Sequence, residues 1–219
     1  KAFWKSAGGA FVWHTGDGLP VSLRAGRDFN AYYDRRGLKF FFDRDPLTDN
    51  EIYACESPDV VCHEQGHAFL DTLRPDLWDS TFLETAALHE AFGDCAAILV
   101  SLQDATIRSI LLTQDASRKT IWLRSNLVSR LAEQLGAAIH HVEGAQSKSG
   151  NSLRDAWNKF AYSPPEKLPS NGSDATLSAE PHNFSRVFTG AIYLALGYAM
   201  RDAWIQSSPI RQAQDREFK

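Results

Sequence analysis

The sequence is poor in cysteine, and its cysteines form no paired motif. The 219 residues include three cysteines, Cys55, Cys62 and Cys95, and none of them belongs to a CxxC pair. Cys62 and Cys95 fall inside helical patterns, where a free thiol usually packs as a small hydrophobic side chain. A Cys55–Cys62 disulfide is the alternative that the sequence leaves open, so cysteine points to no particular function.

The sequence also lacks a basic excess and a long hydrophobic run. Lys and Arg number 23 while Asp and Glu number 27, so the net charge is −4. This balance gives no general attraction to nucleic acid or to an anionic membrane. The longest apolar run, residues 190–200, is too short to span a bilayer, and no signal peptide is visible. We therefore expect neither a nucleic-acid partner nor a membrane partner.

The composition is ordinary for a globular protein with a sizeable core, at 43% hydrophobic and 23% charged residues. Residues 1–56 lack helical periodicity and are rich in glycine and aromatic residues, which indicates strands and turns. Ser57, Pro58 and Asp59 then mark the start of a helix, and Pro75 marks its end.

Three further helices are expected after Pro75. The segment "TFLE", residues 81–84, fits a capping box, and apolar residues at helical spacing continue to residue 102. Residues 120–139 predict the next helix. The segment 144–185 is rich in Gly, Ser, Pro and Asn and predicts mainly loop. A last helix is expected from about Ser185 to Trp204.

These elements predict an α+β protein with two lobes that share a cleft. The β-rich lobe covers residues 1–73 and ends in the first helix. The mainly helical lobe covers residues 74–219 and carries the other helices. The first helix would lie between the two lobes.

The stretch "VVCHEQGHAF" places His63 and His67 four residues apart on that first helix. Residues four apart share one face, so both imidazoles could bind a single ion, and zinc accepts such nitrogen ligands. Glu64 is turned by about 100° from His63, so it could reach a water molecule on the ion without binding the ion itself. The alternative is an ordinary histidine pair on a solvated helix.

A third ligand is available on the next helix. Glu90 lies in the apolar stretch "ALHEAFGDCAA", where a carboxylate needs a partner, and Asp94 follows one turn later on the same face. A ligating histidine often donates its second N–H to such a carboxylate. The alternative is a solvent-facing Glu90. His140, His141 and Glu143 form another cluster, which we interpret as a polar helix end because the first set already completes a site.

At this point the chain resembles the thermolysin-like zinc metalloendopeptidases, the gluzincins. Their HExxH and ExxxD segments correspond to "HEQGH" and "EAFGD" here. "NAYYD", residues 30–34, is similar to the family's edge strand, and "GNSLRD", residues 150–155, to its Ser-Leu-Arg segment. "HNFSRVFTGAIYLAL", residues 182–196, is similar to the segment that opens with the transition-state histidine. The segments stand in family order over roughly residues 30–196.

The resemblance implies a thermolysin-like fold, secretion, and a zinc endopeptidase acting on a peptide or protein substrate. Zinc would be held by His63, His67 and Glu90 and would activate a water molecule. Glu64 would accept the proton of this water and later deliver it to the leaving amine. His182 would help zinc to stabilise the tetrahedral oxyanion.

The same resemblance implies roles in substrate binding. Asn30 and the Ala31 backbone would hold the peptide as an added strand, and Arg154 would contact a substrate carbonyl. Val60 and Leu153 match positions of the family's primary pocket, which implies an apolar residue on the leaving-group side. The alternatives are plain core packing for Val60 and Leu153 and a surface salt bridge for Arg154.

The chain departs from the family at several positions. Trp78 stands where the family has a tyrosine that faces the oxyanion, so only an N–H could assist there. His89 replaces the asparagine before the glutamate ligand and could support a ligand or compete as one. The aspartate that orients the transition-state histidine has no match, and Glu180 is its nearest substitute. The acidic cluster for calcium is largely missing after residue 95, so the sequence does not support calcium binding.

Two rival functions remain open. A zinc aminopeptidase would carry an upstream GxMEN segment, and the only methionine here is Met200. A non-catalytic zinc-binding or peptide-binding module would explain Trp78 and the short C-terminal lobe. It would not explain why Glu64, Arg154 and His182 all stand in family order. The sequence leaves the oligomeric state open.

Overall fold

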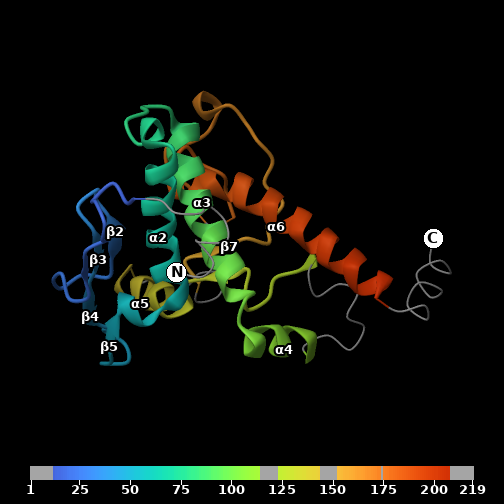
Figure 1. Cartoon of the computed structure of the whole chain (residues 1–219), viewed down its shortest axis with the longest axis horizontal. Coiled ribbons are helices and arrows are strands. Elements are labelled where there is room, and N and C mark those ends of the chain that lie inside the picture. The colour runs from blue at the N-terminus through green and yellow to red at the C-terminus, as the bar shows by residue number, and fades with distance from the viewer. Residues whose placement is uncertain (1–11, 114–122, 144–151, 174, 208–219) are drawn as a thin grey trace.

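A computed structural model describes residues 12–113, 123–143, 152–173 and 175–207. Most strands lie in the first quarter of the chain and are short (Figure 1). One sheet has the order β1-β3-β2, in which β1 runs parallel and β2 antiparallel to β3, so β2 is an edge strand. A separate antiparallel pair joins β4 to β5. The bounds are β1 Val21–Ser22, β2 Ala31–Tyr33, β3 Leu38–Phe40, β4 Phe42–Arg44 and β5 Glu51–Tyr53.

Helices dominate the rest of the described chain and confirm the mixed α+β class. In Figure 1 the strands flank α2, which packs along α3, while α6 crosses α3 and extends away from the strands. The helices are α2 Pro58–Leu73, α3 Leu83–Ser101, α4 Ala105–Thr113, α5 Glu133–Glu143 and α6 Pro181–Gln206. Short 3-10 turns are η1 Ala54–Glu56, η2 Pro75–Leu77 and η4 Pro165–Lys167, and β6 Arg130–Leu131 pairs with β7 Arg154–Asp155.

Two glycines bring α2 and α3 unusually close. A Cβ atom added to Gly66 would lie 2.9 Å from the Cα of Gly93, and one added to Gly93 would lie 2.7 Å from Nδ1 of His63. Both distances are shorter than real Cβ contacts allow, so a side chain at either position would push the helices or the imidazole away. The absence of side chains at these positions therefore allows His63 to lie directly against α3.

The core lies on both sides of the α2–α3 pair. One cluster joins Ala97 and Ile98 of α3 to Leu111 of α4, Leu131 of β6 and Tyr193 of α6. A second cluster packs the β1-β3-β2 sheet against α2 and α5. Its buried members are Tyr33, Leu38, Phe40, Ala54, Val60, Ala68, Ala132 and Leu135. The β1-β3-β2 sheet, α2 and α5 are thus parts of one packed unit.

The expected helix over residues 120–139 is wrong in its first part. Residues 123–129 form turns, β6 follows, and α5 begins only at Glu133; residues 120–122 lie outside the described chain. The side chain of Asn126 accepts hydrogen bonds from the backbone N–H of Val128 (2.9 Å) and of Ser129 (3.2 Å). Its amide donates to the Tyr193 hydroxyl at 2.7 Å. Such side-chain bonds compete with helical backbone bonds, so this segment turns instead.

Two helix starts differ from expectation. No side chain caps α3, whose N-cap position is Phe82, so the predicted capping box at Thr81 is wrong. The last helix begins at Pro181 instead of Ser185, because the Glu180 carboxylate accepts from the N–H groups of His182 and Asn183 and so caps it. Helix α4 was not expected at all.

Two other expectations concern thiols and membranes. Cys55, Cys62 and Cys95 are free thiols, so the Cys55–Cys62 disulfide is not formed.

Within the described residues, no single helix has the length and apolar composition to cross a membrane. Helices α3 and α4 pass that test only as a pair, bent by 87°.

Candidate metal centre

Three side chains from two helices converge on one point. Nε2 of His63 lies 3.1 Å from Nε2 of His67 and 3.3 Å from Oε2 of Glu90. Nε2 of His67 lies 3.6 Å from Oε1 of Glu90. One ligand atom from each residue lies within 4.8 Å of the other two, so the group could hold a metal ion. The sequence predicted this set, and the structure brings all three together.

The chemistry of this group fits a divalent cation. Oε2 of Glu90 is buried and has no hydrogen-bond partner among the described residues. Burial acts to raise the pKa of Glu90, but the close contact with the His63 imidazole and the charges of the nearby histidines lower it. Nδ1 of His63 lies 2.9 Å from Oδ1 of Asp94, which favours a proton on Nδ1 and leaves the Nε2 lone pair for an ion. A cation between two imidazole nitrogens and this carboxylate would satisfy all three groups.

Asp94 supports the centre, as expected. Its carboxylate is buried and accepts hydrogen bonds from Nη2 of Arg154 at 2.8 Å, Nε of Arg154 at 3.2 Å and Oγ1 of Thr189 at 3.3 Å. Burial acts to raise the pKa of Asp94, but the Arg154 charge and the contact with His63 lower it to about 2. Asp94 is therefore a fixed negative charge that orients both His63 and Arg154.

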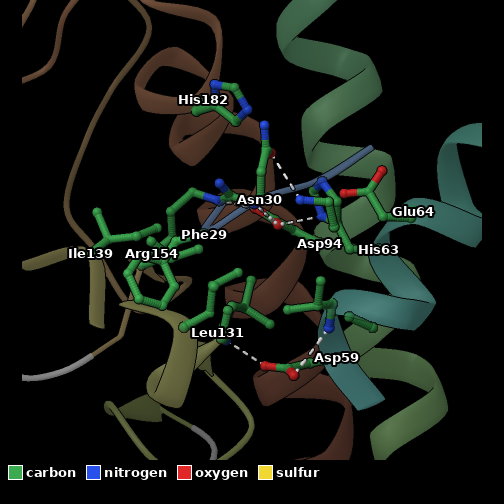
Figure 2. A pocket seen from close by; sticks show the side chains of 16 residues that line it. Phe29, Asn30, Asp59, His63, Glu64, Asp94, Leu131, Ile139, Arg154 and His182 are labelled. Atoms are coloured by element: carbon green, nitrogen blue, oxygen red, sulfur yellow. Dashed lines mark hydrogen bonds and ion pairs between the residues drawn. The ribbon is translucent and has the colours of Figure 1, made fainter. Parts of the chain in front are cut away.

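Two cavities open beside the centre and share some of their walls. The smaller has a volume of about 130 Å³ and the larger about 470 Å³. Figure 2 shows the smaller one, with His63, Glu64 and His182 near one end and Asp59 at the other. Val60, Leu153 and Arg154 line it, and Val60 and Leu153 also belong to the packed core on that side. The residues that line both cavities are Asn30, Ala31, His63, Glu64 and His182.

Glu64 has a different position and environment from Glu90, the carboxylate of the ligand group. It lies next to His63 on α2 and is only 7% exposed. Burial raises the pKa of Glu64, while the positive charge of His63 and a hydrogen bond from the Tyr33 backbone N–H oppose that rise. Since Glu64 is outside the convergent ligand group, its carboxylate is available for proton transfer at the cavity wall.

His182 faces the centre from the start of α6. Its Nδ1 lies 2.7 Å from Oε1 of Glu180, and its Nε2 lies 3.3 Å from Oε2 of Glu90. The hydrogen bond with Glu180 raises the pKa of His182. Its side chain is 57% exposed, so Nε2 remains accessible from the cavities. Glu180, the nearest substitute for the family's orienting aspartate, does make the contact.

Trp78 and His89 lie together at the larger cavity. The Trp78 ring meets the His89 ring edge-on, with centroids 5.6 Å apart and an angle of 84°. His89 also stacks on His67 at 5.8 Å. Neither ring nitrogen of His89 has a hydrogen-bond partner in the described chain, and His89 is outside the convergent ligand group. His89 thus contacts a ligand by its ring face and does not compete as one.

The open edge of β2 runs past the centre. The backbone N–H of Phe41 donates to the Asn30 carbonyl at 3.0 Å. Because bonded and non-bonded pairs alternate along an antiparallel ladder, the backbone groups of Ala31 and Tyr33 then point away from β3. The side-chain oxygen of Asn30 accepts from the Ala31 N–H at 2.8 Å. The outward N–H of Ala31 is thus already bonded within the chain, while its carbonyl also points away from β3 and Ala31 lines both cavities.

Several supporting residues escaped the sequence analysis. Asp71 is buried and binds the Tyr33 hydroxyl at 2.9 Å and Nη2 of Arg35 at 2.6 Å. Gly66 and Gly93 allow the close approach of α2 and α3. A glycine inside each of two strongly predicted helices was the available signal, since glycine is costly there unless packing requires it.

Of the other histidine cluster, the structure describes only the His141 side chain. Nδ1 of His141 lies 2.9 Å from Oδ1 of Asp45, a buried carboxylate. The side chains of His140 and Glu143 lie outside the described part of the chain. Among the described residues, the only group of three suitable side chains is His63, His67 and Glu90.

Comparison with known proteins found no matching family model, no matching curated protein and no matching solved structure.

Proposed function

We propose that this chain is a zinc-dependent endopeptidase with thermolysin-like lobes. One observation carries the proposal: His63, His67 and Glu90 converge at cavities that also hold Glu64, His182 and the outer edge of β2. A metal site built only for stability would be closed by a fourth ligand. Here two titratable side chains and a strand edge face the same space instead.

Zinc suits the two nitrogen ligands and one carboxylate, and when bound it would lower the pKa of a water molecule and polarise a carbonyl. The Glu64 carboxylate would accept the proton of the attacking water and pass it to the leaving nitrogen. Its raised pKa suits this exchange, since a base whose pKa is nearer to neutrality can also act as the acid.

His182 would stabilise the negative charge that develops on the carbonyl oxygen. Glu180 binds Nδ1 at 2.7 Å and raises the pKa of the ring, which favours the doubly protonated form with a proton on Nε2. A donor already aimed at the place where charge develops is effective because it needs no reorganisation.

The substrate would lie along β2. The outward-facing carbonyl of Ala31 would accept a hydrogen bond from an extended peptide, as in other cases of strand addition. Arg154 binds Asp94 through Nε and Nη2, so Nη1 is the guanidinium nitrogen left for a substrate carbonyl. Val60, Leu135 and Leu153 line the smaller cavity, which would take an apolar side chain on the leaving-group side.

Paired glutamate variants test the proposal. Zinc content is measured by elemental analysis, and cleavage of a peptide library by mass spectrometry. Glu64→Gln should keep the zinc and lose cleavage by roughly 10²–10⁴-fold, as general-base removal does. Glu90→Gln should lose zinc affinity as well, because it weakens a ligand. Glu56→Gln, an exposed change just before α2, should alter neither.

The outcomes separate the rival functions. Zinc binding without cleavage of any peptide would favour a non-catalytic zinc-binding or peptide-binding module. Release of single N-terminal residues only would favour an aminopeptidase. Equal cleavage by Glu64→Gln and the parent would reject Glu64 as the base.

A further inference from the structure

The two cavities follow each other along the same two elements. The smaller touches Val60 and His63 on α2 and Phe29 to Ala31 at the start of β2. The larger touches His63 and His67 on α2 and Asn30 to Tyr33 on β2. A peptide extended along β2 would therefore pass the smaller cavity and then the larger one. All three ligands, His63, His67 and Glu90, line the larger cavity, and His63 also lines the smaller. Under the proposed function, the larger cavity would face the residue on the acyl side of the scissile bond.

The wall of the larger cavity is built around Trp78 and is held in place. Besides its contact with His89, the Trp78 ring meets Tyr33 edge-on at 5.3 Å and 81°. The Arg35 guanidinium lies 5.4 Å from the Trp78 ring centroid. Arg35 is itself fixed by Asp71 at 2.6 Å and by the Pro75 carbonyl at 2.8 Å. The indole is thus positioned before any ligand arrives.

The chemistry of this cavity favours an aromatic occupant and disfavours an acidic one. Trp78 and His89 contribute ring surfaces, and Leu77 and Ala86 contribute apolar ones. Aromatic rings prefer offset-stacked or edge-on neighbours, which such walls supply. The Glu64 and Glu90 carboxylates also line the cavity and would repel an acidic side chain. The nearby Arg35 cannot offset that repulsion because it is committed to Asp71.

We propose that the larger cavity is a second side-chain pocket, which selects Phe, Tyr or Trp on the acyl side of the scissile bond. Trp78 is its specificity-determining wall. In this role Trp78 acts through its ring face, and not as a substitute for the tyrosine hydroxyl that the family aims at the oxyanion. This inference rests on the proposed endopeptidase function.

Two variants of residues that line the larger cavity test it, using the zinc-loaded full chain. The substrates are two peptides that differ only in Phe or Ala on the acyl side, with Leu kept on the leaving-group side. Trp78→Ala should lower kcat/KM for the Phe peptide by about tenfold or more, the scale of losing an apolar pocket contact. The Ala peptide should change by less than about twofold, and Trp78→Phe should keep most of the preference.

Ala86→Leu provides the second variant. It fills the larger cavity from α3, so it should also reject Phe and accept Ala. Leu135→Ala is the matched control, because Leu135 lines only the smaller cavity. It should change the leaving-group preference and leave the acyl-side preference intact.

A binding measurement separates this inference from the proposed function. The same two peptides, with the scissile amide replaced by a methyleneamine, are titrated into the zinc-loaded protein by calorimetry. Tighter binding of the Phe analogue that Trp78→Ala abolishes would support the pocket even if no peptide is cleaved. Three outcomes would overturn the inference. The protein could cleave without an acyl-side preference, it could prefer an aromatic residue on the leaving-group side, or both variants could lose activity equally on the two peptides.

Discussion

Three carboxylates close to His63 and His67 differ in pKa. Burial raises the pKa of Glu64, whereas contacts with histidines lower that of Glu90, and Arg154 and His63 lower that of Asp94 to about 2. Their chemical type is shared, so the differences come from their partners. Such separation gives each carboxylate a different role, since Glu90 can bind a cation, Asp94 can orient the ligands, and Glu64 can exchange a proton.

The contact between Glu180 and His182 predicts an effect of pH. Glu180 raises the pKa of His182, and the protonated ring is the proposed donor. The value of kcat/KM should therefore be high below this pKa and fall as pH rises through it. Glu180→Gln removes the negative charge beside His182 and so lowers the pKa of His182. The alkaline limb, which is the fall of kcat/KM at high pH, should therefore move to lower pH. The acid limb, set by Glu64, should stay in place.

Full pH profiles on a cleaved peptide provide the measurement. Glu166→Gln, a change on the exposed η4 turn, should leave both limbs unchanged. Glu180 also caps α6 through the N–H groups of His182 and Asn183, so the variant could lose stability. A uniform drop of kcat/KM without movement of the alkaline limb would mean that capping is its only role.

The sequence was sufficient to find the ligands because they stand on helices with strong periodicity. The spacing of His63 and His67, with Glu90 and Asp94 on the next helix, puts each pair on one helical face. It could not show that Arg154 binds Asp94, because those residues are 60 apart in the chain and only the packing of α3 brings them together.

Helix packing between α2 and α3 depends on Gly93, and this predicts an unusual variant. Alanine is the better helix former by about 1 kcal/mol, so Gly93→Ala should favour α3 locally. Its Cβ atom, however, would lie 2.7 Å from Nδ1 of His63, in the space beside the Asp94 contact. We expect zinc affinity to fall by roughly 10–100-fold, as when a ligand loses its supporting contact.

Competition with a zinc-binding dye measures this affinity, and circular dichroism checks that the helices remain. Gly18→Ala is the control, since no atom lies within 4 Å of a Cβ added there. Unchanged zinc affinity in a folded Gly93→Ala protein would show that His63 can move without cost to the site.

Among the elements, the three helices that build the site were the predictable ones. α2, α3 and α6 bury long apolar faces, and their periodicity is visible in the sequence. The turn at residues 123–129 was not predictable in this way. It depends on Asn126, whose amide reaches the Tyr193 hydroxyl 67 residues later. A local sequence pattern cannot predict a contact between residues so far apart in the chain.

At the scale of the whole molecule, the site joins segments that are distant in the chain. β2 lies at its edge, α2 and α3 supply the ligands, β7 supplies Arg154 and α6 supplies His182. The site therefore joins residues 1–73 to residues 74–219, and an ion there would tie α2 directly to α3. Metal binding should consequently stabilise the folded chain as a whole.

Thermal unfolding with and without zinc tests this coupling. An ion that binds only the folded chain adds about 4 kcal/mol at a thousandfold excess over its Kd. The melting temperature should therefore rise by several degrees with zinc and return to the metal-free value with a chelator. Glu90→Gln should lose most of this rise because it weakens a ligand. His141→Ala should keep it, since His141 pairs with Asp45 away from the centre. A rise that survives Glu90→Gln but disappears in His141→Ala would place the stabilising ion at the other histidine cluster and reject the centre between α2 and α3.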